Sequence, residues 1–101
     1  MIDLTFRVLS NEHRRRILTE LLEVHKNGGV CVPEEVVAEE EELDTVHVAL
    51  THRHLPLLEE TGFVEWDVSA HIVHRGDKFD EVRPLLRLLT ANPHKLPGEW
   101  A

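Results

Sequence analysis

The chain has 101 residues, of which 42% are hydrophobic and 30% are charged, and its formal net charge at pH 7 is −8. This length and apolar content predict one folded domain and exclude a disordered tail protein. There is no run of about 18 apolar residues and no basic-then-apolar leader, so we expect neither a transmembrane span nor a signal peptide. The single cysteine, Cys31, cannot form an internal disulfide, which favours the cytoplasm.

The excess of acidic residues argues against a polyanionic partner, because contacts to phosphate supply most of the nonspecific affinity for nucleic acid. However, arginines far outnumber lysines, and lysine occurs only at Lys26, Lys78 and Lys95. An acidic surface with few lysines is typical of a cytoplasm at high salt, where screening at about 1 M shortens electrostatic reach to ~3 Å. If the protein is halophilic, its net charge says little about whether DNA is a partner. An ordinary acidic protein is the alternative.

The first half of the chain predicts helices around one short strand. A short helix covers Leu4 to Leu9, and an N-cap at Ser10 begins an amphipathic helix that runs through Lys26 and ends at the glycines that follow. Val30 to Val32 is an extended run. Pro33 then opens a helix that continues to Ala38.

The second half predicts a long helix, a hairpin and a final helix. Asp44 or Thr45 caps a helix that ends at Thr61, with a kink or a loosened turn near Pro56. Two β-type runs follow, residues 63–67 and 70–75, joined by a turn at 68–69. Asp77 caps the last helix, which contains Pro84, and residues 92–101 form an irregular tail.

The resulting order is helix, short strand, helix, helix, hairpin, helix, which is the order of a winged helix-turn-helix. The predicted fold class is therefore mainly α with a small β-hairpin. We expect one domain over residues 1–91, with the last helix included as a dimerisation helix, and the tail over 92–101.

Two stretches of the sequence resemble known winged-helix regulators. LSNEHRRRIL (residues 9–18) is similar to the opening of ArsR-type regulators, and HLPLLEETGFVEWD (residues 54–67) is similar to their recognition-helix ending and wing. The second stretch resembles more narrowly a pattern of small haloarchaeal winged-helix domains whose roles are largely unassigned. The resemblance covers residues 4 to about 90 and implies a dimeric transcription regulator that binds double-stranded DNA.

This sequence departs from the ArsR pattern in two ways. The stretch from Val37 to Leu55 is longer than usual by a few residues, so the turn between the two helices is not standard. The cysteine pair that many ArsR sensors use for metals is missing, because Cys31 stands alone. Metal sensing is therefore not carried over.

The resemblance places the helix from about 45 to 61 in the major groove and the hairpin 63–75 as the wing. Thr45, Ala49, His52 and Arg53 then face the base edges, where arginine pairs with guanine and alanine contacts a thymine methyl. Ser69, His71 and Arg75 reach phosphate or the minor groove. The alternatives are a solvated helix face and a plain surface hairpin. His54 lies on the apolar side of the helix and is expected in the core.

The last helix carries more leucine than one side of a small domain needs, which predicts an interface. ArsR-like proteins pair through their terminal helices, so the resemblance implies a symmetric dimer. Its predicted residues are Leu4, Phe6, Leu85, Leu86, Leu88 and Leu89, with Trp100 as a further candidate. The alternative is that this helix only closes the core of one subunit.

Neither metal ligation nor catalysis is predicted. The eight histidines include no pair with convincing ligand spacing, and the sequence has no glycine-rich phosphate loop, nucleophile elbow or HExxH helix. We therefore expect no metal, no cofactor and no enzymatic activity. For Arg14, Arg15 and Arg16, internal pairing of at least one is favoured over phosphate contact.

The competing hypothesis is a winged helix that binds another protein and no DNA, and a third hypothesis is a regulator that responds to a metal or a ligand. An ion-paired Arg53 on a helix face ringed by carboxylates would favour that hypothesis.

Overall fold

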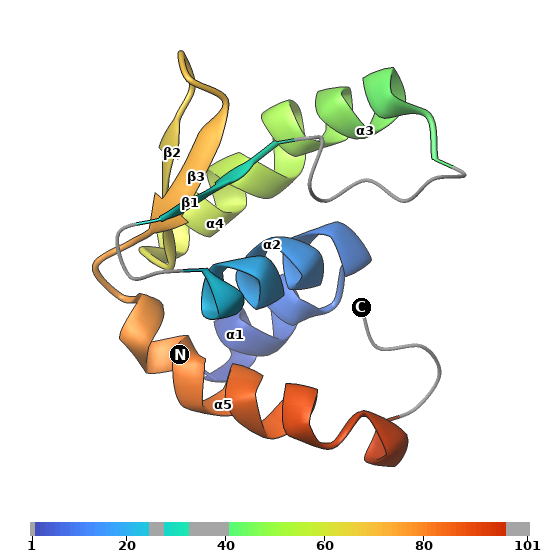
Figure 1. The fold of residues 1–101 in the computed structure, drawn as a ribbon, viewed down its shortest axis with the longest axis vertical. Helices are drawn as coiled ribbons and strands as arrows, with labels where there is room; N and C mark the ends of the chain where they lie inside the picture. Colours follow the sequence, from blue (N-terminus) through green and yellow to red (C-terminus); the bar gives the residue numbers. More distant parts are fainter. Residues whose placement is uncertain (1, 25–27, 33–40, 97–101) are drawn as a thin grey trace.

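Figure 1 shows the computed structural model, which describes residues 2–24, 28–32 and 41–96. The helices are α1 (Ile2–Leu9), α2 (Glu12–Glu23), α3 (Leu43–Ala49), α4 (Leu55–Thr61) and α5 (Phe79–Ala91). The strands are β1 (Gly29–Cys31), β2 (Val64–Asp67) and β3 (Ile72–Arg75). A π turn, Leu50–His54, joins α3 to α4, and a 3-10 turn, Pro93–Lys95, follows α5.

The three strands form one antiparallel sheet in the order β1-β3-β2, so the hairpin β2–β3 is extended by the short strand β1. The hairpin tip projects from the end of the molecule opposite to α5 (Figure 1). This confirms the predicted fold class, mainly helical with a small hairpin. The helix predicted from Pro33 to Ala38 lies outside the described residues.

A single hydrophobic core joins the helices to the sheet. Its fully buried side chains come from α1, α2, residues 43–63, the sheet and α5, and include Val8, Ile17, Leu18, Leu21, Val30, Leu58, Phe63, Val73 and Leu86. The α5 helix packs against α2. In the described parts of the chain, no helix is long and apolar enough to cross a membrane.

The junction of α1 and α2 corrects the predicted cap. Asn11, not Ser10, is the N-cap of α2, and its side-chain oxygen accepts hydrogen bonds from the backbone amides of His13 (2.9 Å) and Arg14 (3.2 Å). The Ser10 hydroxyl instead donates to the Arg7 carbonyl of α1 (2.6 Å). The prediction was wrong by one residue, because serine and asparagine serve equally well as caps and here serine closes the preceding helix.

Residues 43–61 form one continuous helical run, named segment 43–61 from here on. It begins at Leu43 after Glu42, so the predicted caps Asp44 and Thr45 lie within its first turn. The loosened turn predicted near Pro56 is confirmed as the π turn, in which the Leu55 amide donates to the Leu50 carbonyl five residues back. A proline ring clashes with the carbonyl four residues earlier, and a wider turn relieves that clash.

Two glycines meet where segment 43–61, the hairpin and α5 come together. Gly62 ends α4 in the left-handed conformation, with φ +83°, which glycine adopts without strain. A Cβ on Gly76 would overlap the Gly62 carbonyl oxygen and lie 2.8 Å from the Val64 amide nitrogen. The Lys78 amide donates to the Gly62 carbonyl (2.8 Å), and α5 begins after Lys78, not at the predicted cap Asp77.

The turn of the hairpin is longer than predicted. Ala70 and His71 belong to the turn and not to β3, which begins at Ile72. His71 adopts φ +57°, and the Ala70 amide donates to the Asp67 carboxylate (3.1 Å). Aspartate at the first position of a turn and a histidine in the left-handed region both favour a turn over a strand.

Candidate nucleic-acid interface

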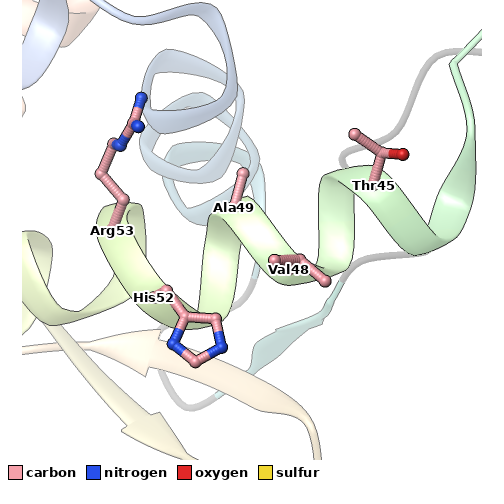
Figure 2. A pocket seen from close by; sticks show the side chains of 5 residues that line it. All are labelled: Thr45, Val48, Ala49, His52 and Arg53. Carbon is pink, nitrogen blue, oxygen red and sulfur yellow. The ribbon is translucent and has the colours of Figure 1, made fainter.

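A solvent-open hollow of about 540 Å³ lies along the exposed side of segment 43–61. Its lining residues are Thr45, Val48, Ala49, His52 and Arg53, and Figure 2 shows them in place. The four residues that the sequence predicted as base-reading are therefore on one surface, joined by Val48. Thr45, Ala49 and Arg53 point to the same side of the helix, whereas the His52 ring points away from them (Figure 2).

Arg53 carries a positive charge that is available to a partner. Its side chain is exposed, and among the described residues no carboxylate lies within ion-pairing distance of it. The described side chains that line the hollow include no acidic residue. The described residues therefore do not show the ion-paired Arg53 that would favour a protein-interaction face.

Two of the three residues predicted as wing contacts are accessible in the hairpin turn. Ser69 and His71 are exposed in the turn of the hairpin. The His71 ring also contacts the ring of His47 on α3, with 5.9 Å between the ring centroids. The turn of the hairpin and α3 are therefore neighbours, so one ligand surface can include both.

Arg75 is a correction to the predicted wing contacts. Its guanidinium donates to the carbonyls of Leu21 (3.0 Å), Leu22 (3.3 Å) and Val24 (3.3 Å) at the C-terminus of α2. It also lies over the Phe79 ring, 4.9 Å from the centroid. A cation there satisfies the unpaired carbonyls and the negative end of the helix dipole. Arg75 thus stabilises the fold and is removed from the candidate interface.

The arginine-rich start of α2 is also occupied within the protein, as the preference for internal pairing predicted. Arg14 is only 8% exposed and donates to the carbonyls of Val8 (2.9 Å) and Arg7 (3.1 Å) at the end of α1. Arg15 donates to the Leu9 carbonyl (2.8 Å). The two guanidiniums therefore close the C-terminus of α1, in the same way that Arg75 closes α2.

His54 connects this cap to segment 43–61. It is 3% exposed, as predicted for a core histidine, and its Nδ1 lies 3.0 Å from a guanidinium nitrogen of Arg14. Because arginine can only donate, Nδ1 must accept, and His54 is neutral. Burial, followed by the charge of Arg14, lowers the pKa of His54 to about 4. Burial and the charges of Arg7 and Arg53 lower the pKa of Arg14.

A separate polar cluster joins α2 to Glu41, two residues before segment 43–61. His13 Nε2 lies 2.6 Å from one carboxylate oxygen of Glu41, and Arg16 lies 2.9 Å from the other. Glu12, His13 and Glu41 are close enough to share a metal ion. However, Arg16 also pairs with Glu12 (3.5 Å), so both carboxylates already have a cationic partner. The geometry is that of an ion-pair network, which sequence spacing could not reveal because Glu41 is 28 residues from His13.

The residues predicted for a dimer interface divide into two groups. Phe6 is 57% exposed and Leu88 is 61% exposed, so both are available to a partner. Leu86 is fully buried in the core, which corrects its assignment to the interface. Leu85 and Leu89 are half-buried against the core, and Leu4 is partly exposed. Trp100 lies outside the described residues.

The described elements form a mainly helical fold with a small three-stranded antiparallel sheet, which is compatible with a layout of helices and a hairpin wing. Residues 6–74 match the model of a family described as a domain of unknown function, DUF7344. The match covers more than half of the chain, and the chain belongs to this family. No curated protein and no solved structure matches it.

Proposed function

We propose that the protein is a DNA-binding regulator that acts as a dimer, with segment 43–61 in the major groove and the hairpin as the wing. The observation that carries the proposal is the exposed surface formed by Thr45, Ala49, His52 and Arg53, whose guanidinium has no acidic partner among the described residues. Arginine pairs bidentately with guanine, threonine bonds to phosphate or a base edge, and alanine contacts a thymine methyl.

Few arginines are available for this interface, which agrees with binding through a few base contacts. Arg14, Arg15, Arg16 and Arg75 bond within the protein. Nonspecific binding through many phosphate contacts is therefore not the main source of affinity. In an acidic protein the contribution has to come from a few base contacts made by segment 43–61 and from the turn of the wing, at Ser69 and His71.

The dimer would form through α1 and α5, whose exposed apolar side chains include Phe6 and Leu88. These helices lie away from the hairpin tip, so pairing through them leaves both recognition surfaces free (Figure 1). The test is the molar mass in solution by light scattering. Phe6→Glu should give monomers, and a monomeric wild type would remove this part of the proposal.

The competing function is that of a protein-interaction module without DNA binding. One observation favours it: Val48 is 57% exposed in the middle of the hollow, between Thr45 and Ala49, and an apolar centre suits a protein partner. Arg53, which has no acidic partner among the described residues, favours DNA instead. A thymine methyl is also an apolar partner, so Val48 fits both functions.

The experiment is a DNA-binding titration at several salt concentrations with sites selected from a random duplex library. Arg53→Ala should weaken binding to the selected site by about 1–3 kcal/mol. Arg87→Ala is the matched control, because Arg87 is an exposed arginine on α5, outside the proposed surface. Equal binding by wild type and Arg53→Ala, or no selected site at all, would refute the proposal.

A further inference from the structure

The π turn in segment 43–61 has a geometric effect on both faces of the helix. Four buried side chains follow each other at intervals of four residues, Val46, Leu50, His54 and Leu58, and each is at most 4% exposed. In a regular α-helix each residue turns by about 100°, so an interval of four drifts by about 40° and three such intervals drift by about 120°. In a uniform α-helix the four would spread over about a third of the helix circumference.

The π turn removes part of this drift. Its hydrogen bond spans five residues, from the Leu55 amide to the Leu50 carbonyl, so each residue in it turns by less than in an α-helix. The same correction acts on the exposed face, where Thr45, Ala49 and Arg53 are also four residues apart. Without it, Arg53 would be rotated by about 80° from Thr45. Figure 2 shows the three side chains on one side of the helix.

We infer that the π turn is the element that determines base specificity, because it aligns Arg53 with Thr45 and Ala49 so that all three enter one groove. This inference rests on the proposed DNA-binding function. The aligned residues span about 12 Å along the helix axis, which corresponds to about three or four base pairs at 3.4 Å each. The preferred ligand is then a duplex with a guanine at the end of a short site, opposite Arg53.

Pro56 and the buried stripe hold this turn in place. Pro56 lacks the amide that an α-helix would direct to the carbonyl of His52, and its ring excludes the regular geometry. His54 is fixed in the core by its hydrogen bond with Arg14, at 3.0 Å. Arg53 precedes His54 in the chain. The fixed position of His54 therefore also fixes the backbone of Arg53, while the Arg53 side chain stays exposed. Pro56 and His54 are positioning residues, because His54 is buried and Pro56 is not among the residues that line the hollow with Arg53.

The test is Pro56→Ala, which restores the amide that an α-helix bonds to the His52 carbonyl and so favours α turns without changing the number of residues. In a uniform α-helix Arg53 would lie about 80° from Thr45. The variant should therefore retain its affinity for random duplex DNA within about twofold and lose about tenfold of its preference for guanine at one position. Circular dichroism and urea unfolding establish that the variant is folded. Deletion of Thr51 is the second variant: it also gives α turns but leaves Arg53 about seven residues from Thr45, about 20° apart, so it should keep the preference.

The matched control is Pro84→Ala, which removes a proline from the interior of α5, away from the proposed groove. It should leave the guanine preference unchanged. A folded Pro56→Ala variant that keeps the wild-type preference would overturn the inference and leave the proposed function intact. If the wild type selects no DNA site, the proposed function and this inference both fall.

Discussion

The start of α2 and the middle of segment 43–61 both carry arginines, and they use them in opposite ways. Arg14 and Arg15 point inward and bond to the carbonyls that end α1, whereas Arg53 is exposed on the helix surface. The densest positive charge in the sequence is therefore structural, and an isolated arginine is the candidate for recognition. What separates them is the presence of helix-terminal carbonyls nearby, not the local density of charge.

Removing the inward-pointing arginine should have the largest effect on stability. Arg14→Met keeps the aliphatic stem but leaves the Val8 carbonyl, the Arg7 carbonyl and His54 Nδ1 without their donor. We expect the free energy of unfolding to fall by about 3 kcal/mol, measured by urea denaturation. Arg87→Met on α5 is the control and should change it by less than about 0.5 kcal/mol. A small effect at Arg14 would mean that its bonds add little.

Lowering the pH should break the contact between Arg14 and His54, because it protonates the histidine. The pKa of His54 in the folded protein is about 4, below its ordinary value of 6.5, so the unfolded chain takes up this proton first as the pH falls. The contribution of His54 is present above pH 6.5 and is lost as the pH falls toward 4. From pH 7.5 to pH 5 we expect a loss of about 2 kcal/mol.

Urea titrations at a series of pH values measure this loss. His54→Gln retains an acceptor for Arg14 but does not titrate, so its stability should depend less on pH. His94→Gln is the control, since His94 is exposed in the turn after α5. If His54→Gln has the acid sensitivity of the wild type, protonation of His54 beside Arg14 is not its source.

The cap on α2 should contribute less than the cap on α1, because Arg75 is only half-buried. Arg75→Gln removes the donors to the carbonyls of Leu21, Leu22 and Val24 and should cost about 1–2 kcal/mol. Thermal unfolding measures this change. DNA affinity, measured well below the unfolding temperature, should stay as in the wild type. A loss of affinity in a fully folded variant would return Arg75 to the wing interface.

The smallest stability change is expected at Arg53. Because its side chain is exposed, Arg53→Ala should alter the free energy of unfolding by no more than about 0.5 kcal/mol. The same substitution should have the largest effect on DNA binding. Loss of stability would then identify the arginines that cap helices, and loss of affinity would identify Arg53. A variant that unfolds readily would show that Arg53 serves the fold instead.

The sequence predicted the elements well and their ends less well. Apolar periodicity defined the helices and the hairpin, because burial on one side imposes that pattern. Ser10, Asp44, Thr45 and Asp77 were wrong as caps, since several residues near each helix start can cap and tertiary contacts choose among them. The turn at Ala70 and His71 was missed because its apolar neighbours resemble strand residues.

For the candidate site, the exposed helix positions could be predicted from a helical projection, but the hydrogen-bond partners of each arginine could not. Arg75 bonds to residues more than 50 positions away, and Arg14 to His54 across 40. Such partners are set by how the elements pack. The π turn did leave a signal: the apolar side chains at 46, 50 and 58 follow a period of four, longer than the 3.6 of an α-helix.

The contact between Gly62 and Gly76 has a consequence for how this family can diversify. It closes the chain on itself at the base of the hairpin, with the Gly76 amide bonded to the Phe63 carbonyl (2.9 Å). The two ends of the hairpin, Val64 and Arg75, therefore lie side by side at this contact, which is called the neck below. Lengthening or exchanging the outer part of that loop leaves the neck and the rest of the core in place, so relatives can acquire new contacts there by simple insertion.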